Sequence, residues 1–311
     1  MNRSAPRAWR VVQWVVGAGV IALAVRALVR NWADLRSQPL ALEPRPLYLL
    51  ASVLITWAMY AVLIAAWRAL LASWGQRLDP RTAARIWTVS NLGKYLPGKV
   101  WALAGMTLLS QRAGVAPWAA AASAVVLQAV SIGTGAAIVG LAGAVALEAA
   151  HPGTRAALLV LVLASAVAVG LVLWPPMARR LLGLAGVDTA SARPPAASAV
   201  LLGIVSGVLA WLGYGVALVC LARGLLPGVR LDLVTATGAF TASYLAGLLA
   251  LVAPGGIGVR ESVMILLLQA PLGLAAATVL ALASRVLLTI AELGAAAPFL
   301  LSSDRSARVP D

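Results

Sequence analysis

The sequence predicts an all-α integral membrane protein that crosses the bilayer several times. Of its 311 residues, 62% are hydrophobic and only 11% are charged, whereas a soluble domain is normally about 45–50% apolar and about 25% charged. The mean hydropathy of +0.94 agrees with this composition. At about 20 residues per spanning helix, the chain accommodates about seven or eight transmembrane helices in a single membrane domain, residues 1–311. A soluble globular enzyme is therefore excluded.

Uninterrupted apolar runs predict the individual spanning helices. A first helix is expected over 9–29, behind a basic N-terminal tail of residues 1–10; a cleaved signal peptide is the alternative for this region. A short polar tail is expected over 302–311. The remaining predicted runs cover 47–66, 116–147, 156–174, 199–222, 233–253 and 272–301.

The charge balance is strongly basic, with 24 Lys and Arg against 10 Asp and Glu and a formal net charge of +14. In a membrane protein such an excess is expected in cytoplasmic loops and beside anionic lipid headgroups. No nucleic-acid partner is therefore expected. Arg3, Arg7 and Arg10 predict a cytoplasmic N-terminus by the positive-inside rule. The side of the C-terminus and the oligomeric state are left open.

Two segments, one in each half of the chain, fit no simple spanning helix. The first lies within 85–111, reads Asn91-Leu92-Gly93-Lys94-Tyr95-Leu96-Pro97-Gly98-Lys99 and holds both lysines of the protein. The second lies within 254–271 and reads Pro254-Gly255-Gly256-Ile257-Gly258-Val259-Arg260-Glu261. Each combines a Pro-Gly pair, a nearby cation and a short apolar run that follows, so the two segments suggest an internal repeat.

These segments predict broken, re-entrant helices around a binding site near the bilayer midplane. Proline removes a backbone donor and glycine permits unusual dihedral angles, so one helix ends there and another begins. Paired interruptions of this kind point to the binding site of a transporter, and free N–H groups at helix starts suit an anion such as phosphate. A kinked helix or an interfacial turn is the alternative for each segment. The candidate substrate-binding residues are Asn91, Lys94, Tyr95, Pro97, Gly98, Lys99, Pro254, Gly255, Gly256, Gly258, Arg260 and Glu261.

Two further ionisable residues, Arg285 and Glu292, lie inside the last apolar run. Seven positions place them on the same helical face but about 10 Å apart, too far for a direct bridge. Each is therefore expected to meet a partner from another element or a water-filled cavity, with a role in charge coupling. A structural pair between Glu261 and Arg285 that holds the bundle shut is the alternative.

Catalytic chemistry finds little support in the sequence, and no enzymatic activity or cofactor is expected. The one histidine, His151, falls in a predicted loop and the one cysteine, Cys220, in an apolar run, so neither a Ser-His-Asp triad nor a zinc cage is predicted. A nucleotide loop of the GxxxxGK[ST] type is also missing from the sequence. Any transport is therefore expected to use an ion gradient or to run downhill.

The two broken segments resemble the signature motifs of the lysylphosphatidylglycerol synthase transmembrane-region family. This is a flippase-like membrane domain that is also found fused to aminoacyl-phospholipid synthases, and the resemblance covers about residues 11–301. It implies lipid translocation in the cytoplasmic membrane of a bacterial cell. It does not imply synthase activity, because the sequence leaves no soluble stretch long enough for a transferase.

Three functions remain open from the sequence. The leading interpretation is a flippase or scramblase-like transporter for a phosphate-bearing amphiphile, either an anionic phospholipid or a polyprenyl phosphate, whose phosphate Lys94, Lys99 and Arg260 neutralise. The alternative is a non-transporting accessory protein that presents such a lipid to a separate glycosyltransferase or phospholipid synthase. The third is an intramembrane lipid-modifying enzyme that uses Lys94 or Glu261.

Overall fold

Helices make up every regular element that the structure describes. The computed structural model describes residues 42–95, 101–147, 194–250 and 253–302, and single residues at 170, 180 and 183. Within these residues the elements are α-helices and short 3-10 helices, with no strand. The predicted class, an all-α polytopic membrane protein, is confirmed. The predicted helix over 9–29, and all of 156–174 except Gly170, lie outside the described residues.

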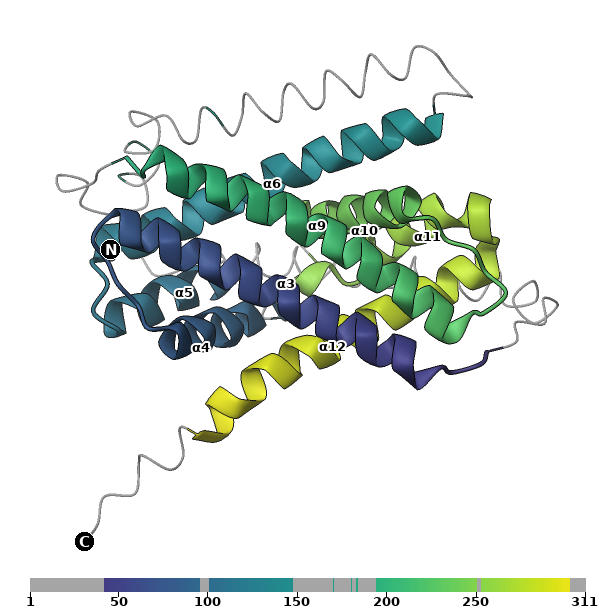
Figure 1. The fold of residues 1–311 in the computed structure, drawn as a ribbon, viewed down its shortest axis with the longest axis horizontal. Coiled ribbons are helices and arrows are strands. Elements are labelled where there is room, and N and C mark those ends of the chain that lie inside the picture. The colour runs from purple at the N-terminus through teal and green to yellow at the C-terminus, as the bar shows by residue number, and fades with distance from the viewer. Residues whose placement is uncertain are drawn as a thin grey trace, which may run out of the picture.

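Four long helices run through the molecule (Figure 1): α3 (Pro46–Ser73), α6 (Pro117–Leu147), α9 (Ala197–Leu225) and α12 (Leu274–Ser302). The shortest has 28 residues, which at 1.5 Å per residue gives about 42 Å, more than the roughly 30 Å hydrocarbon core of a bilayer. All four are long and apolar enough to cross a membrane. The run predicted over 272–301 begins as a helix only after Gly273, whose φ of 79° turns the chain there.

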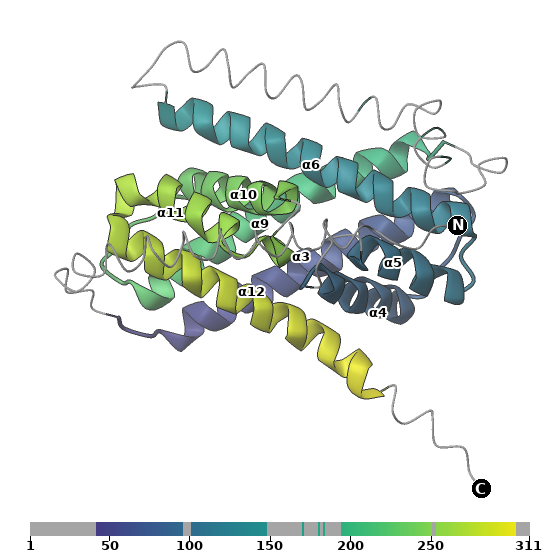
Figure 2. The same cartoon turned by 180° about the vertical axis from the view of Figure 1, so that it is seen from behind.

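Four shorter helices form two pairs at opposite ends of the molecule (Figure 2). The first pair is α4 (Pro80–Asn91) with α5 (Trp101–Arg112), and the second is α10 (Leu233–Leu249) with α11 (Val259–Leu272). The 12-residue helices α4 and α5 are about 18 Å long, too short to cross the hydrocarbon core. The run predicted over 233–253 ends as a helix at Leu249, ahead of the second Pro-Gly segment.

Each pair of short helices is interrupted by one of the two predicted segments. In the first break, α4 continues directly into the 3-10 helix η1 (Leu92–Tyr95). In the second break, residues 254–258, the 3-10 helix η2 (Pro254–Gly256) lies between α10 and α11. The first helix of each pair starts on an aspartate cap, because Asp79 accepts the Thr82 N–H at 3.0 Å and Asp232 accepts the Thr235 N–H at 2.9 Å.

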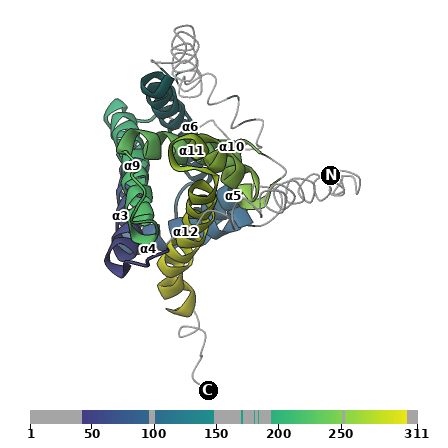
Figure 3. The same ribbon diagram turned by 90° about the vertical axis from the view of Figure 1, so that its right-hand side faces the viewer.

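The helices pack around two main apolar cores, beside a small third cluster formed by Leu70, Val126, Val130 and Ala199. α3 lies along α9 and forms one side of the bundle (Figure 3). α10 packs against α6, α9 and α11, and α11 packs against α10 and α12. The larger core joins α3, α9, α10, α11 and α12 and is rich in aromatic rings. The smaller core joins α3, α4, α5 and α6 around the fully buried Trp67. The large rings of the first core are Tyr60, Trp211, Tyr214 and Phe240, with Tyr244 packed against them.

Candidate functional site

The two breaks, far apart in the sequence, meet in the folded protein. The 3-10 helices η1 and η2 are in contact. A Cβ built on Gly255 lies 3.4 Å from Cδ1 of Tyr95, so the tyrosine ring of the first break rests on the glycine of the second. The same Cβ lies 2.8 Å from Nη2 of Arg285 on α12. The two segments and α12 therefore form one cluster.

The second break depends on glycine for its shape. Gly255, Gly256 and Gly258 have φ values of 57°, 71° and 85°, a region that other L-residues rarely adopt. A Cβ on Gly256 would also lie only 2.8 Å from Cα of Gly247 in α10, so the backbones touch there. Glu261 then caps α11, because its Oε2 accepts the Gly258 N–H at 2.6 Å. This geometry sets the path of the chain beside α10 and α12.

Three donors converge on the carboxylate of Glu292 in α12, which is 5% exposed. Lys94 Nζ lies 2.5 Å from Oε1, and the Tyr95 hydroxyl donates to Oε2 at 2.8 Å. The Tyr60 hydroxyl of α3 donates to Oε1 at 3.4 Å. Tyr95 also lies within hydrogen-bond distance, 3.2 Å, of the Thr289 hydroxyl. Glu292 therefore links the first break to α3 and α12.

Arg285 lies about two helical turns before Glu292 on the same face of α12, and it connects α12 to the second break. Its Nη1 donates to the carbonyl oxygen of Gly255 at 2.7 Å, and its Nε lies 3.7 Å from Oε1 of Glu261. Arg285 and Glu292 thus each meet a charged partner from another element, which is one of the two surroundings that the sequence suggested. The Glu261–Arg285 pair is the structural pair that the sequence suggested as the alternative.

Arg260 is the most deeply buried cation of the cluster, at 5% exposure. Its guanidinium carbon lies 4.9 Å from the ring centre of Phe240 and 5.0 Å from that of Tyr244. Its Nε and Nη2 are buried and donate no hydrogen bond to the described part of the chain. Counting the described ionisable groups, three cations stand against two carboxylates, which leaves one net positive charge in the cluster. Of these three cations, Arg260 is the one that forms no ion pair with a carboxylate of the described residues.

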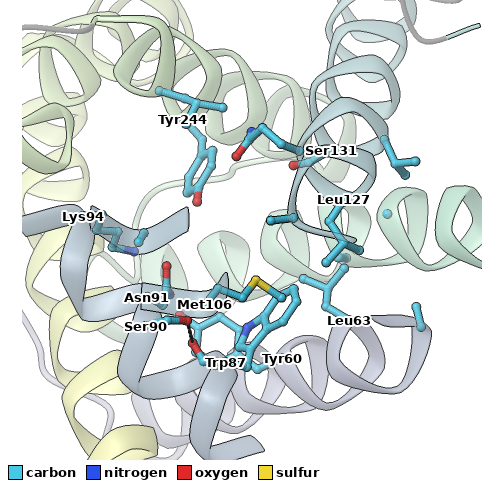
Figure 4. A pocket seen from close by; sticks show the side chains of 18 of the residues that line it. Tyr60, Leu63, Trp87, Ser90, Asn91, Lys94, Met106, Leu127, Ser131 and Tyr244 are labelled. Carbon is cyan, nitrogen blue, oxygen red and sulfur yellow. Dashed lines mark hydrogen bonds between the residues drawn. The ribbon is translucent and has the colours of Figure 1, made fainter. Parts of the chain in front are cut away.

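A cavity of about 200 Å³ lies against one side of this cluster. Its walls are mostly apolar and come from α3, α4, α5, α6, α9, α10 and α12. Lys94 and Glu292 stand at its charged end, and Asn91 lies one helical turn before Lys94. In Figure 4 the side chains of Lys94, Asn91, Tyr244 and Ser131 point toward the same open space. The cavity thus combines one charged end with a long apolar wall.

The predicted site residues separate into three groups. Asn91, Lys94 and Glu292 line the cavity. Residues 97–99 lie outside the described part of the chain, so Pro97, Gly98 and Lys99 have no placement. Pro254 begins η2. The others gather behind the charged end and are not among the described residues that line the cavity: Tyr95, Gly255, Gly256, Gly258, Arg260, Glu261 and Arg285.

Several cavity residues were missed by sequence reasoning. Gln128 and Ser131 of α6 line the wall, as do Tyr60, Trp87 and Tyr244. Gln128 is a polar residue within the apolar run predicted over 116–147, and that contrast was the available signal. The aromatic residues gave no local signal, because rings are common in membrane helices and only packing brings these together. In the described ranges, no three His, Cys, Asp or Glu side chains gather as a metal site requires.

Fold and site together define a polytopic helical membrane protein with a buried, charged site beside an apolar cavity. A comparison with protein families matches the lysylphosphatidylglycerol synthase transmembrane region over residues 10–293. The chain therefore belongs to this family, as its two motifs suggested, and is a membrane protein of lipid-related function. A comparison with curated proteins finds no match.

Proposed function

We propose that this protein is a flippase-like transporter that moves a phosphate-bearing amphiphile across the bacterial cytoplasmic membrane. The observation that carries the proposal is the cavity, which places Lys94 at one end of an otherwise mostly apolar wall, beside a cluster with one uncompensated positive charge. A buried charge without a counter-ion is costly. An entering phosphate supplies the missing negative charge, so the site favours an anionic headgroup.

Lys94 is the group that meets the phosphate in this proposal. In the described structure its ammonium is held by Glu292. An ammonium carries three donors, so Lys94 can bind a phosphate oxygen while it keeps or exchanges its bond to Glu292. The Tyr60 and Tyr95 hydroxyls, which already donate to Glu292, keep that carboxylate hydrogen-bonded during the exchange.

The cavity volume suits a headgroup rather than a whole lipid. Pockets that enclose drug-sized ligands measure about 300–1,000 Å³, whereas this cavity measures about 200 Å³. The acyl or prenyl chains therefore stay in the bilayer while the headgroup passes through the protein. Short helices and two breaks that meet beside the cavity provide the hinges for alternating access, in the manner of transporters with broken helices.

The test uses purified protein in vesicles that contain tail-labelled lipids with different headgroups. We expect wild type to bring label to the opposite leaflet, and Lys94→Ala to slow this movement at least tenfold while remaining folded. Arg85→Ala is the matched control, because Arg85 is an exposed cation on α4, the helix that leads into η1, and is not among the residues that line the cavity. Equal movement by wild type and Lys94→Ala overturns the assignment of Lys94. Lipid that co-purifies without any movement supports the accessory protein instead.

A further inference from the structure

The cavity wall opposite the charged end carries uncharged polar groups that the proposed phosphate contact does not use. Gln128 and Ser131 lie three positions apart on one face of α6, and Asn91 faces them from α4. Two carboxamides and one hydroxyl offer both donors and acceptors. The described part of the chain provides no hydrogen-bond partner for these three side chains. They form an open polar wall on the way to Lys94.

Aromatic rings border this polar wall. Trp87 lies one helical turn before Asn91, and Tyr244 reaches the cavity from α10 (Figure 4). A ring offers a flat apolar surface, and the tyrosine adds a hydroxyl at its tip. A combination of amides, hydroxyls and ring faces fits a headgroup that has hydroxyls on its edges and C–H groups on its faces.

The same cavity offers a positively charged headgroup no free carboxylate among its described lining residues. Among the described lining residues Glu292 is the one carboxylate, and Lys94, Tyr95 and Tyr60 already bind it. An ammonium group entering the cavity would also meet a cluster with a net positive charge. Burying a charge without a partner is far more costly than burying a hydrogen-bonded hydroxyl.

We propose that the cavity selects an uncharged, hydroxyl-bearing headgroup carried on a single phosphate, with Asn91, Gln128 and Ser131 binding its hydroxyls. The glycerol of a phosphatidylglycerol and the sugar of a glycosyl phosphate lipid share this chemistry. One phosphodiester brings one negative charge, which matches the one uncompensated positive charge of the cluster. This inference rests on the proposed function and narrows it. It also excludes lysyl-phosphatidylglycerol as the cargo, because a lysyl headgroup carries two ammonium groups.

Competition for a labelled lipid tests the headgroup preference. Purified full-length protein in detergent is loaded with tail-labelled phosphatidylglycerol and challenged with unlabelled lipids of five headgroups. We expect phosphatidylglycerol and a monoglycosyl polyprenyl phosphate to compete best, and whichever is stronger identifies the source. Phosphatidic acid, which lacks the hydroxyls, competes about tenfold more weakly, and phosphatidylethanolamine and lysyl-phosphatidylglycerol more weakly still. If lysyl-phosphatidylglycerol competes as strongly as phosphatidylglycerol, the inference is overturned.

Variants of Gln128 test the polar wall directly. Gln128→Leu keeps the approximate size of the side chain and removes its donors and acceptors, so we expect about tenfold weaker binding of phosphatidylglycerol and unchanged binding of phosphatidic acid. Gln128→Glu adds a free carboxylate and is expected to raise the affinity for phosphatidylethanolamine relative to phosphatidylglycerol. Gln269→Leu is the matched control, because Gln269 is exposed and lies outside the cavity. If both Gln128 variants keep the wild-type headgroup preference, the proposed role of the polar wall in headgroup selection is contradicted.

The failure of this inference can be distinguished from the failure of the proposed function. If vesicles show no lipid movement while the binding order stands, transport fails and the headgroup inference holds. If lipid moves but cationic headgroups bind and move as well as hydroxylated ones, the transporter stands and the headgroup inference is overturned. Variants whose unfolding temperature matches wild type make both outcomes interpretable.

Discussion

The two breaks have similar sequences but make different contacts. The first break contributes directly to the cavity, because Lys94 lines it. Tyr95 lies beside Lys94, and both residues bind the carboxylate of Glu292. The second break makes its contacts away from the cavity, because Glu261 caps α11 and Arg285 of α12 donates to the Gly255 carbonyl. This difference indicates that the first break places the proposed phosphate-binding cation, Lys94, in the cavity wall, whereas the second break supports it from behind.

The largest expected effect comes from removing the carboxylate that faces the first break. Glu292→Ala leaves Lys94 without its counter-ion, and breaking a buried pair in this way typically costs about 3–5 kcal/mol. Because Lys94 keeps partial exposure, we expect a loss of about 3 kcal/mol in the free energy of unfolding. Glu261→Ala costs less, because Arg285 retains its bond to Gly255.

Denaturant unfolding in detergent, followed by tryptophan fluorescence, measures both variants. Adding Lys94→Ala to Glu292→Ala should recover part of the loss, since the second substitution removes the charge that the first one leaves unpaired. Equal losses from Glu292→Ala and Glu261→Ala would remove the contrast between the breaks.

A smaller effect is expected at the backbone of the second break. Gly256→Ala forces a side chain into a φ of 71° and against Cα of Gly247, so we expect about 2–3 kcal/mol of destabilisation. Gly75→Ala separates the two causes: its φ is 75°, but nothing lies within 4 Å of the added Cβ. The control should lose only about 1 kcal/mol in the same unfolding measurement. Equal losses would mean that the close approach of α10 contributes nothing.

Arg260 tests whether the second break acts only as a support. Arg260→Met keeps much of the side-chain volume, and replacing a buried charge by an apolar residue is often neutral for stability. The charge lies one ring away from the cavity, since Tyr244 both lines the cavity and contacts the guanidinium. A full charge acting over such distances contributes on the order of 1–2 kcal/mol, so we expect about tenfold weaker binding of phosphatidylglycerol. Unchanged affinity in a competition assay would assign Arg260 to structure alone.

The smallest effect is expected where the two halves agree, at their aspartate caps. Partial burial raises the pKa of Asp232, but the hydrogen bonds from Thr235 outweigh it and lower that pKa. Asp232→Ala should therefore cost about 1 kcal/mol near pH 7. Because the folded-state pKa is lowered, the stabilisation is present above the ordinary pKa of aspartate and disappears as the pH falls through the folded-state value.

Unfolding curves of wild type and Asp232→Ala should thus converge in acid and separate toward neutral pH. The hydrogen bond from Thr82 likewise lowers the pKa of Asp79. The unfolding curves of wild type and Asp79→Ala should therefore also converge in acid. A variant curve that stays parallel to wild type down to acid pH contradicts the cap assignment.

Much of the candidate site could be predicted from local sequence. Both Pro-Gly segments stood out because helix-breaking residues interrupt apolar runs, and both contain residues of the charged cluster, such as Lys94 and Glu261. Arg285 and Glu292 stood out because charges are rare in such runs. Gln128 was overlooked, because one amide in a long apolar helix gives only a weak signal until packing turns it toward a cavity.

Sequence alone determined the membrane class, three of the four long spans nearly to their ends, and the two segments around which the site is built. These features depend on composition, hydropathy and backbone preference, which act over a few neighbouring residues. Tertiary structure alone decided that Lys94 pairs with Glu292, that Arg260 lies behind Tyr244 rather than in the cavity, and that α6 supplies a polar wall. Such contacts join residues far apart in the chain, so only the packing of the helices selects them.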